Sequence, residues 1–157
     1  MRRNKKIQWA FGDIFIVPLI NNKYCVGQAL DLMMPNVVRC AFFNEIVDDV
    51  NKINLSNLTY PDDLISLIAV SREQLDYGAW KIIGNKRITI PEKAFPNQQY
   101  KSARWVGAKI YDAALAEDFL NAFFALIPWD DWHNPNYLDS FLVDMSKKPN
   151  NLILIKS

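Results

Sequence analysis

Few side chains of this sequence combine the type and the spacing that catalysis or metal binding requires. His133 is the only histidine, which excludes every site that needs two imidazoles. Together with Asp130 and Asp131 it could contact a metal, since carboxylates and imidazole are competent ligands. Adjacent carboxylates point in different directions, however, and the sequence implies no fourth ligand. We therefore favour a solvated, acidic joint between two helices and expect no metal and no other cofactor.

The two cysteines, Cys25 and Cys40, both lie in apolar runs that are typical of strands. A cysteine nucleophile needs a lowered pKa and solvent access, and burial in a strand provides neither. Two cysteines are compatible with one disulfide, but without a secretory signal we interpret both as reduced core thiols. The sequence also contains no phosphate-binding glycine loop, no serine elbow and no paired-cysteine zinc spacing. It therefore predicts a protein that is not an enzyme.

Charged side chains are segregated along the chain, although their sum is only +1. Residues 1–43 carry six basic and two acidic side chains, and residues 64–109 carry eight basic and three acidic ones. Residues 44–63 carry five acidic side chains and one basic, and residues 110–146 carry seven carboxylates and no lysine or arginine. Segregation on this scale indicates recognition of a partner or docking between the two halves of the chain.

The elements that must position these residues begin with a predicted antiparallel hairpin. Two apolar runs, residues 13–19 and 24–30, straddle an Asn-Asn turn. Gly27 inside the second run indicates a bend or a close approach of another backbone. Residues 44–63 are expected to form a long polar loop with a short helical or strand piece. The other expected elements are strands at residues 37–43, 65–70, 80–83, 87–90, 105–111 and 152–155 and helices at residues 72–76, 113–126 and 134–142. The strands at residues 80–83 and 87–90 are expected to pair as a second hairpin across a Gly84-Asn85 turn, and Ser71 and Gln74 have the spacing of a capping box for the helix at residues 72–76.

This order of elements predicts an α+β fold. We expect a curved, mostly antiparallel β-sheet, or a small open barrel, with two C-terminal helices packed on it. Residues 1–157 are interpreted as one domain, in which residues 12–111 are mainly β and residues 112–146 are helical and acidic. A chain of 157 residues buries roughly two-thirds of its unfolded surface, so one core is sufficient.

Nothing in the chain predicts a membrane segment or a secretory signal. The basic N-terminus is followed by no long apolar region, and the longest apolar stretch, residues 113–127, contains Glu117, Asp118 and Asn121. It is shorter than the roughly 20 residues that cross a bilayer. We therefore expect a cytoplasmic protein without membrane contact. The basic N-terminal arm lacks interleaved aromatic residues, so we interpret it as a solvated terminus and do not expect direct binding of nucleic acid.

Three short motifs carry a resemblance to a known family. They are the strand that begins at Gly12-Asp13-Ile14-Phe15, the segment Tyr24-Cys25-Val26-Gly27-Gln28-Ala29-Leu30 and the segment Trp80-Lys81-Ile82-Ile83-Gly84. Over about residues 12–90 the chain resembles the immunity protein 26 family of bacterial polymorphic-toxin systems. The resemblance implies a mostly β domain that neutralises, by stoichiometric binding, a cognate toxin made by the neighbouring gene, and it brings no catalytic residues.

The charge pattern agrees with such a partner. Toxins that cut nucleic acid have basic clefts, and a carboxylate-rich face could occupy such a cleft and associate quickly by electrostatic steering. Tryptophans beside carboxylates are typical of binding hot spots, although both tryptophans could instead pack in the core. We therefore predict a contact face made of Glu45, Asp48, Asp49, Trp129, Asp130, Asp131 and Trp132.

Two other classes of protein remain open at this stage. A Gly-Asp strand followed by a hairpin also opens the small barrels of messenger-RNA-cleaving toxins, so the alternative is an RNase or RNA-binding protein of the toxin–antitoxin type. The carboxylates of residues 110–146 argue against this alternative, because they would repel phosphate. A plain interaction module without any toxin partner is the third reading.

Overall fold

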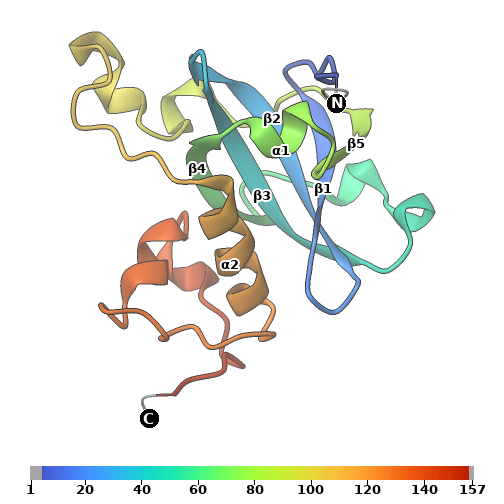
Figure 1. Ribbon diagram of the computed structural model, residues 1–157, viewed down its shortest axis with the longest axis vertical. Coiled ribbons are helices and arrows are strands. Elements are labelled where there is room, and N and C mark those ends of the chain that lie inside the picture. The colour runs from blue at the N-terminus through green and yellow to red at the C-terminus, as the bar shows by residue number, and fades with distance from the viewer. Residues whose placement is uncertain (1–4, 156–157) are drawn as a thin grey trace.

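The core of the protein is a five-stranded antiparallel sheet, seen in a computed structural model that describes residues 5–155 (Figure 1). In spatial order the strands are β4, β3, β2, β1 and β5, so β4 and β5 form two open edges. The predicted α+β class and curved antiparallel sheet are confirmed, and the sheet does not close into a barrel. The strands are β1 (Asp13–Pro18), β2 (Tyr24–Met34), β3 (Val37–Val47), β4 (Leu64–Ser71) and β5 (Lys81–Asn85).

The helical elements are short, apart from one. Helix α1 (Glu73–Asp76) follows β4, and α2 (Ala113–Phe123) is the one long helix of the described residues. The 3₁₀ turns are η1 (Val50–Lys52), η2 (Leu55–Asn57), η3 (Glu92–Ala94), η4 (Gln98–Ala103), η5 (Tyr137–Phe141) and η6 (Met145–Lys147). The two predicted C-terminal helices thus correspond to α2 and the shorter η5.

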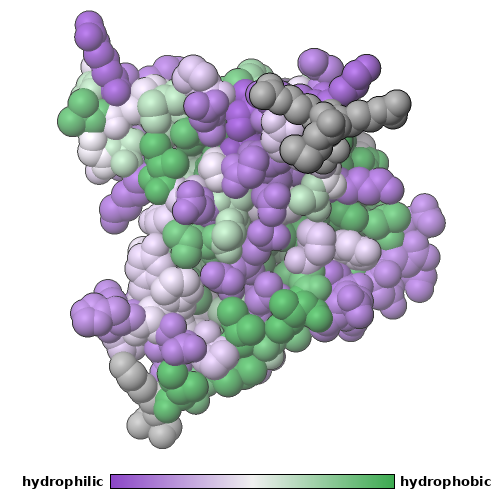
Figure 2. Space-filling model, in the orientation of Figure 1, coloured by the Kyte–Doolittle hydropathy of each residue, from purple (hydrophilic) through white to green (hydrophobic). Residues whose placement is uncertain are grey.

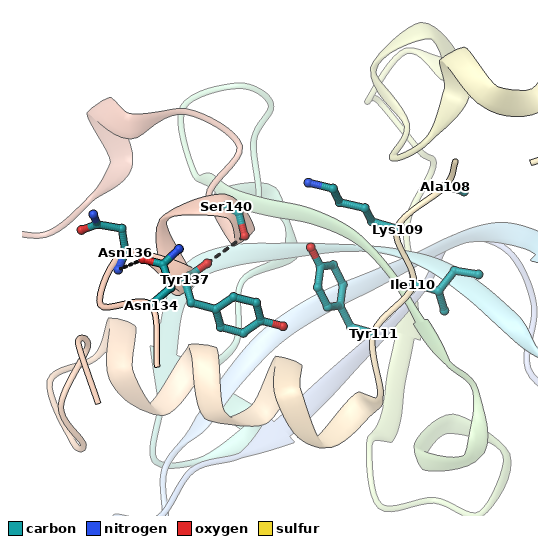
Figure 3. A pocket seen from close by; sticks show the side chains of 8 residues that line it. All are labelled: Ala108, Lys109, Ile110, Tyr111, Asn134, Asn136, Tyr137 and Ser140. Carbon is teal, nitrogen blue, oxygen red and sulfur yellow. Dashed lines mark hydrogen bonds between the residues drawn. The ribbon is translucent and has the colours of Figure 1, made fainter. Parts of the chain in front are cut away.

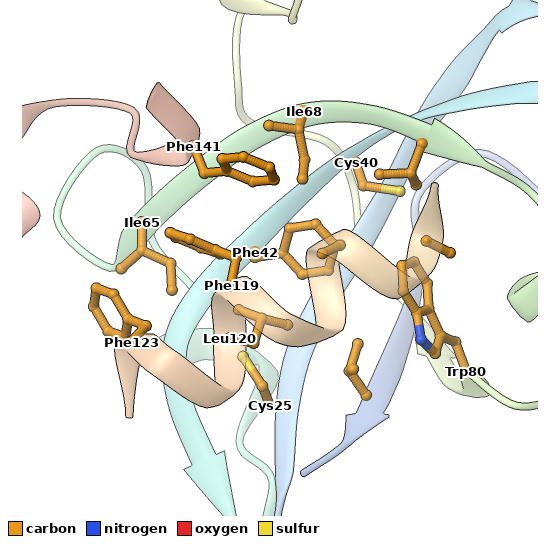
Figure 4. Packing of buried hydrophobic residues seen from close by; sticks show 14 of the residues in the cluster. Cys25, Cys40, Phe42, Ile65, Ile68, Trp80, Phe119, Leu120, Phe123 and Phe141 are labelled. Carbon is orange, nitrogen blue, oxygen red and sulfur yellow. The ribbon is translucent and has the colours of Figure 1, made fainter. Parts of the chain in front are cut away.

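Both faces of the sheet are covered, which explains the nearly continuous apolar runs of β2, β3 and β4. On one face, Phe15, Phe42 and Ile65 pack in a cluster with residues of α2 and η5. Figure 4 shows α2 lying across the strands with Phe119, Leu120 and Phe123 among these side chains. On the other face a second cluster includes Leu58, Ile90 and Phe95, from the loops that follow β3 and β5.

The hairpin of β1 and β2 forms as predicted, with Asn22 in the left-handed conformation (φ 65°) at its turn. Phe15 is the register partner of Gly27, and the Phe15 ring lies over the glycine while stacking on Trp80 at 5.2 Å between ring centroids. A Cβ atom at position 27 would be 2.6 Å from Cζ of Phe15. The predicted backbone approach is present only as the Ala41 carbonyl, 3.0 Å from that Cβ position, and the closest group is the Phe15 side chain.

Cys25 and Cys40 are free thiols, and both are completely buried. Burial raises the pKa of each thiol far above its ordinary value, so both stay protonated. The prediction of reduced core thiols is confirmed.

The predicted second hairpin is wrong. Strand β5 does not pair with residues 87–90. It pairs with β1, with Ile82 opposite Phe15 and Lys81 opposite Ile16. Gly84 and Asn85 belong to β5 itself rather than to a turn. The apolar side chains of residues 87–90 are explained by packing, since Ile88 and Ile90 join the cluster on the second face of the sheet.

Two other predicted strands are reduced to single bridges. Arg104, Trp105 and Gly107 have positive φ angles, and residues 104–107 form a turn. Of the residues that follow in this predicted strand, only Tyr111 pairs, with Val70 of β4. In residues 152–155, likewise, only Ile153 pairs, with Pro128. The capping box predicted at Ser71 is also absent, because no side chain caps the start of α1. The Ser71 hydroxyl instead donates to the Glu73 carboxylate and accepts from the Ala113 amide.

A buried arginine attaches the long segment after β5 to the sheet. Arg39 of β3 is 1% exposed and forms a two-bond ion pair with Asp31, both bonds being 2.6 Å long. It also donates to the Pro96 carbonyl (3.2 Å) and the Gln98 side chain (2.8 Å), and its guanidinium lies 5.0 Å from the Phe95 ring centroid. These contacts hold residues 95–98 against the sheet.

Candidate functional site

The first three predicted contact residues lie together at the end of β3 and the start of η1. Glu45 is half-buried in β3, whereas Asp48 is exposed and approaches Lys52 only to 3.9 Å. Asp49 caps η1, because its side chain accepts a hydrogen bond of 2.9 Å from the Asn51 amide. We call Glu45, Asp48 and Asp49 the β3 patch. An ion pair as long and exposed as Asp48–Lys52 neutralises little charge, so the patch stays negative.

Two of the predicted contact residues, Trp129 and Asp130, do not lie on the surface. Trp129 is 1% exposed, packs on Phe119 and donates its indole N–H to Asp139 at 2.8 Å. Asp130 is 5% exposed and accepts a hydrogen bond from the Ile155 amide at 2.8 Å. Trp129 and Asp130 therefore cannot be surface contacts as predicted. Burial of the large apolar indole stabilises the core, and the Asp130 carboxylate binds the backbone of the C-terminal segment.

Asp131 and Trp132, the last two predicted contact residues, line a small pocket of about 340 Å³ together with Asp118. Asp131 is exposed, and the Trp132 ring packs on Tyr137 at 5.0 Å between centroids. Partial burial raises the pKa of Asp118 above its ordinary value. The sequence pattern did not single out Asp118, since it reads as part of the polar stripe of a helix.

The structure does not bring these residues into one acidic face. Figure 1 shows the segment after β3 at the right of the molecule and the segment after α2 at the lower left. Figure 2 shows hydrophilic side chains along the right margin and hydrophobic ones near the lower edge, between these two regions. The predicted face is therefore divided into the β3 patch and a second, smaller site at Asp131 and Trp132.

A larger pocket, of about 520 Å³, lies where sequence reasoning expected a strand and a helix (Figure 3). The extended chain at Lys109 and Tyr111 forms one wall, and the turn that contains Tyr137 and Ser140 forms the other. No sequence motif indicated this pocket, because its walls come together only through the packing of Tyr111 and Tyr137 on Phe141.

Residues 5–155 contain neither a recognisable metal-binding group nor a membrane-spanning helix. Within that range no three histidine, cysteine, aspartate or glutamate side chains form a group that could hold a metal ion. No helix in the same range is long and apolar enough to span a bilayer.

A family model described as Immunity protein 26 matches residues 10–104. The match includes all five strands and the β3 patch, and it ends before α2 and the pockets of the C-terminal part. No curated protein and no solved structure matches the chain significantly.

Proposed function

We propose that this chain, which belongs to the immunity protein 26 family, binds a cognate toxin domain and neutralises it as a stoichiometric complex. The family match over residues 10–104 is the observation that carries the proposal. An inhibitor of this kind needs a rigid scaffold that presents a surface. The doubly covered sheet provides such a scaffold, and its two thiols are protonated and enclosed.

The β3 patch is the contact surface that we propose. It lies within the residues that match the family, its carboxylates are accessible or half-buried, and its ion pairing is weak. A negative patch fits a partner with a basic cleft, such as a nuclease, and speeds the encounter with it. Because the targets of a nuclease toxin are inside the cell, we place the complex in the cytoplasm. Asp131 and Trp132 form a second candidate contact.

The test is a binding experiment with the toxin domain encoded beside the gene of this chain. We expect one complex with a 1:1 mass by light scattering, a calorimetric stoichiometry of one, and restored growth when both proteins are co-expressed. A toxin domain from an unrelated system serves as the control and should not bind. Absence of a complex with the neighbouring toxin at micromolar concentrations would contradict the proposal.

The alternative, an RNase or RNA-binding protein, depended on a small barrel. The sheet is open at β4 and β5, so the described residues do not form the closed barrel of that class. Incubation of the purified chain with single-stranded RNA separates the two functions: an immunity protein leaves the RNA intact, whereas cleavage by the chain alone would favour the alternative.

A further inference from the structure

Strand β4 leaves one residue of its outer edge without a backbone partner. Since hydrogen-bonding groups alternate along a strand, the outward bonds of Ile65, Ala69 and Ser71 show that Leu67 also directs its N–H and C=O away from β3. The Ile65 carbonyl accepts from Val143 (2.9 Å), the Ala69 carbonyl accepts from Tyr111 (3.0 Å), and the Ser71 amide donates to Tyr111 (3.1 Å). Among the described residues, nothing bonds to the outward groups of Leu67.

The free edge at Leu67 opens into a groove. Leu67 lines a pocket of about 150 Å³, and this pocket shares Lys109, Tyr111 and Ser140 with the pocket of about 520 Å³ described above. We call the two together the β4 groove. Figure 3 shows β4 passing behind Lys109 and Tyr111, with Tyr137 and Ser140 on the opposite wall.

The β4 groove is rich in hydrogen-bond donors, and no acidic side chain lines either of its pockets. Asn97 fixes the backbone of Lys109 with two hydrogen bonds, of 2.8 and 2.9 Å, while the Lys109 ammonium has no ion pair among the described residues. Burial and the neighbouring Tyr111 raise the pKa of Tyr137, which keeps its hydroxyl protonated and able to donate. Such a site favours a carboxylate.

We propose that the β4 groove binds an extended segment of the toxin, whose backbone pairs with Leu67 and whose aspartate or glutamate side chain pairs with Lys109. This inference rests on the proposed function and names a second contact for the same complex. Addition of a strand to a sheet edge provides affinity through backbone bonds and specificity through alternate side chains. The interval between the capped residues Ile65 and Ala69 is about 13 Å, which limits the pairing to a short segment.

One partner can reach both contacts. The Asp63 carbonyl accepts a hydrogen bond of 2.7 Å from the amide of Asn44, which precedes Glu45 of the β3 patch. Leu67 is four residues further along the chain, a distance of about 13 Å. The β3 patch would therefore bind a basic part of the toxin surface, and the β4 groove would bind an acidic part of the same surface.

Hydrogen exchange of the Leu67 amide tests the backbone pairing. In ¹⁵N-labelled protein this amide should exchange at least tenfold more slowly after the toxin domain of the neighbouring gene is added. The amides of Ser66 and Ile68 point toward β3 and serve as internal references. If the Leu67 amide still exchanges rapidly in a saturated complex, the strand pairing is refuted.

Charge reversal tests the acidic side chain of the partner. K109E should weaken toxin binding at least tenfold in calorimetry, whereas K109R should stay within threefold of the wild type. K93E, at an exposed lysine of η3 outside the groove, is the matched control and should change the affinity less than twofold. S140W, at an exposed residue of the groove wall, should block binding sterically while circular dichroism shows an intact fold.

The outcomes separate the two proposals. If the wild type binds the toxin and K109E and S140W bind equally well, the groove proposal is overturned and the proposed function stands. If Leu67 is protected but K109E binds like K93E, the assignment of an acidic partner side chain is overturned. If the wild type does not bind the toxin at all, the proposed function itself fails.

Discussion

At the scale of single residues, Gly27 shows how one missing side chain shapes the core. The Phe15 ring occupies the space above Gly27, contacts Phe42 edge-on and stacks on Trp80. The sequence showed only a glycine inside an apolar strand, from which the close approach of another backbone or a bend could be inferred. The structure identifies the approaching group as an aromatic ring from the neighbouring strand.

We expect G27A to lower the free energy of unfolding by about 1–3 kcal/mol, because the new methyl group would overlap the Phe15 ring in a packed core. Chemical denaturation measures this change. G84A is the matched control, since a Cβ at Gly84 meets Leu55 at an ordinary 3.5 Å, and it should change stability by less than about 1 kcal/mol. Equal effects of the two substitutions would contradict the packing argument.

At the scale of elements, Arg39 connects parts that are distant in sequence. It bonds Asp31 in the adjacent strand, the Pro96 carbonyl and the Gln98 side chain at the start of η4. Its guanidinium also lies over the rings of Phe95 and Trp105. The nearby Asn97 then fixes Lys109 and thus one wall of the β4 groove. A single buried cation therefore helps to position the segment that we propose as a binding site.

Removal of this cation should be costly. We expect R39M to lower the free energy of unfolding by about 3 kcal/mol, because Asp31 would lose its partner in a largely buried site. Denaturation and exchange of the amides of residues 95–110 would measure the loss of stability and the release of the segment. K52M breaks the exposed 3.9 Å pair with Asp48 and should cost less than about 0.5 kcal/mol. If R39M is as mild as K52M, the ion pair does not hold this segment.

At the scale of the whole molecule, the segregation of charge along the chain does not become one acidic face. Several carboxylates are used internally: Asp31 pairs with Arg39, Asp76 with Arg72, and Asp139 with Lys148. The β3 patch remains as a negative surface within the matched family region. Its field acts on the encounter with a basic partner more than on the lifetime of the complex.

Charge reversal in the β3 patch should therefore slow association with the neighbouring toxin. We expect E45K/D48K to reduce the on-rate about tenfold at low ionic strength, with a smaller effect at high salt, as measured by stopped-flow or surface-based kinetics. D131K should reduce it about threefold. E92K, which changes an exposed carboxylate paired with Lys101, alters the net charge as much as D131K does and half as much as E45K/D48K, and it should leave the on-rate nearly unchanged. An unchanged on-rate for E45K/D48K would exclude the β3 patch as the contact surface.

The sequence alone predicted the features that depend on local pattern and composition. The hairpin of β1 and β2, strands β3 and β4, the turn of α1 and the long helix α2 all follow from apolar periodicity and turn residues. Burial of the two thiols followed from the strands that contain them. The family resemblance also rested on short motifs in this region, and the family match confirms it.

The tertiary structure decided what depends on distant partners. The sequence pattern paired strand β5 with residues 87–90, yet β5 pairs with β1. Pairing with β1 adds β5 to the main sheet and its core, which stabilises it more than a short isolated hairpin would. Trp129 and Asp130 looked like a contact face until packing placed them inside. The free backbone of Leu67 and the donors of Lys109 and Tyr137 come from segments 28 to 70 residues apart. Only folding brings them to one groove, since no local pattern encodes that proximity.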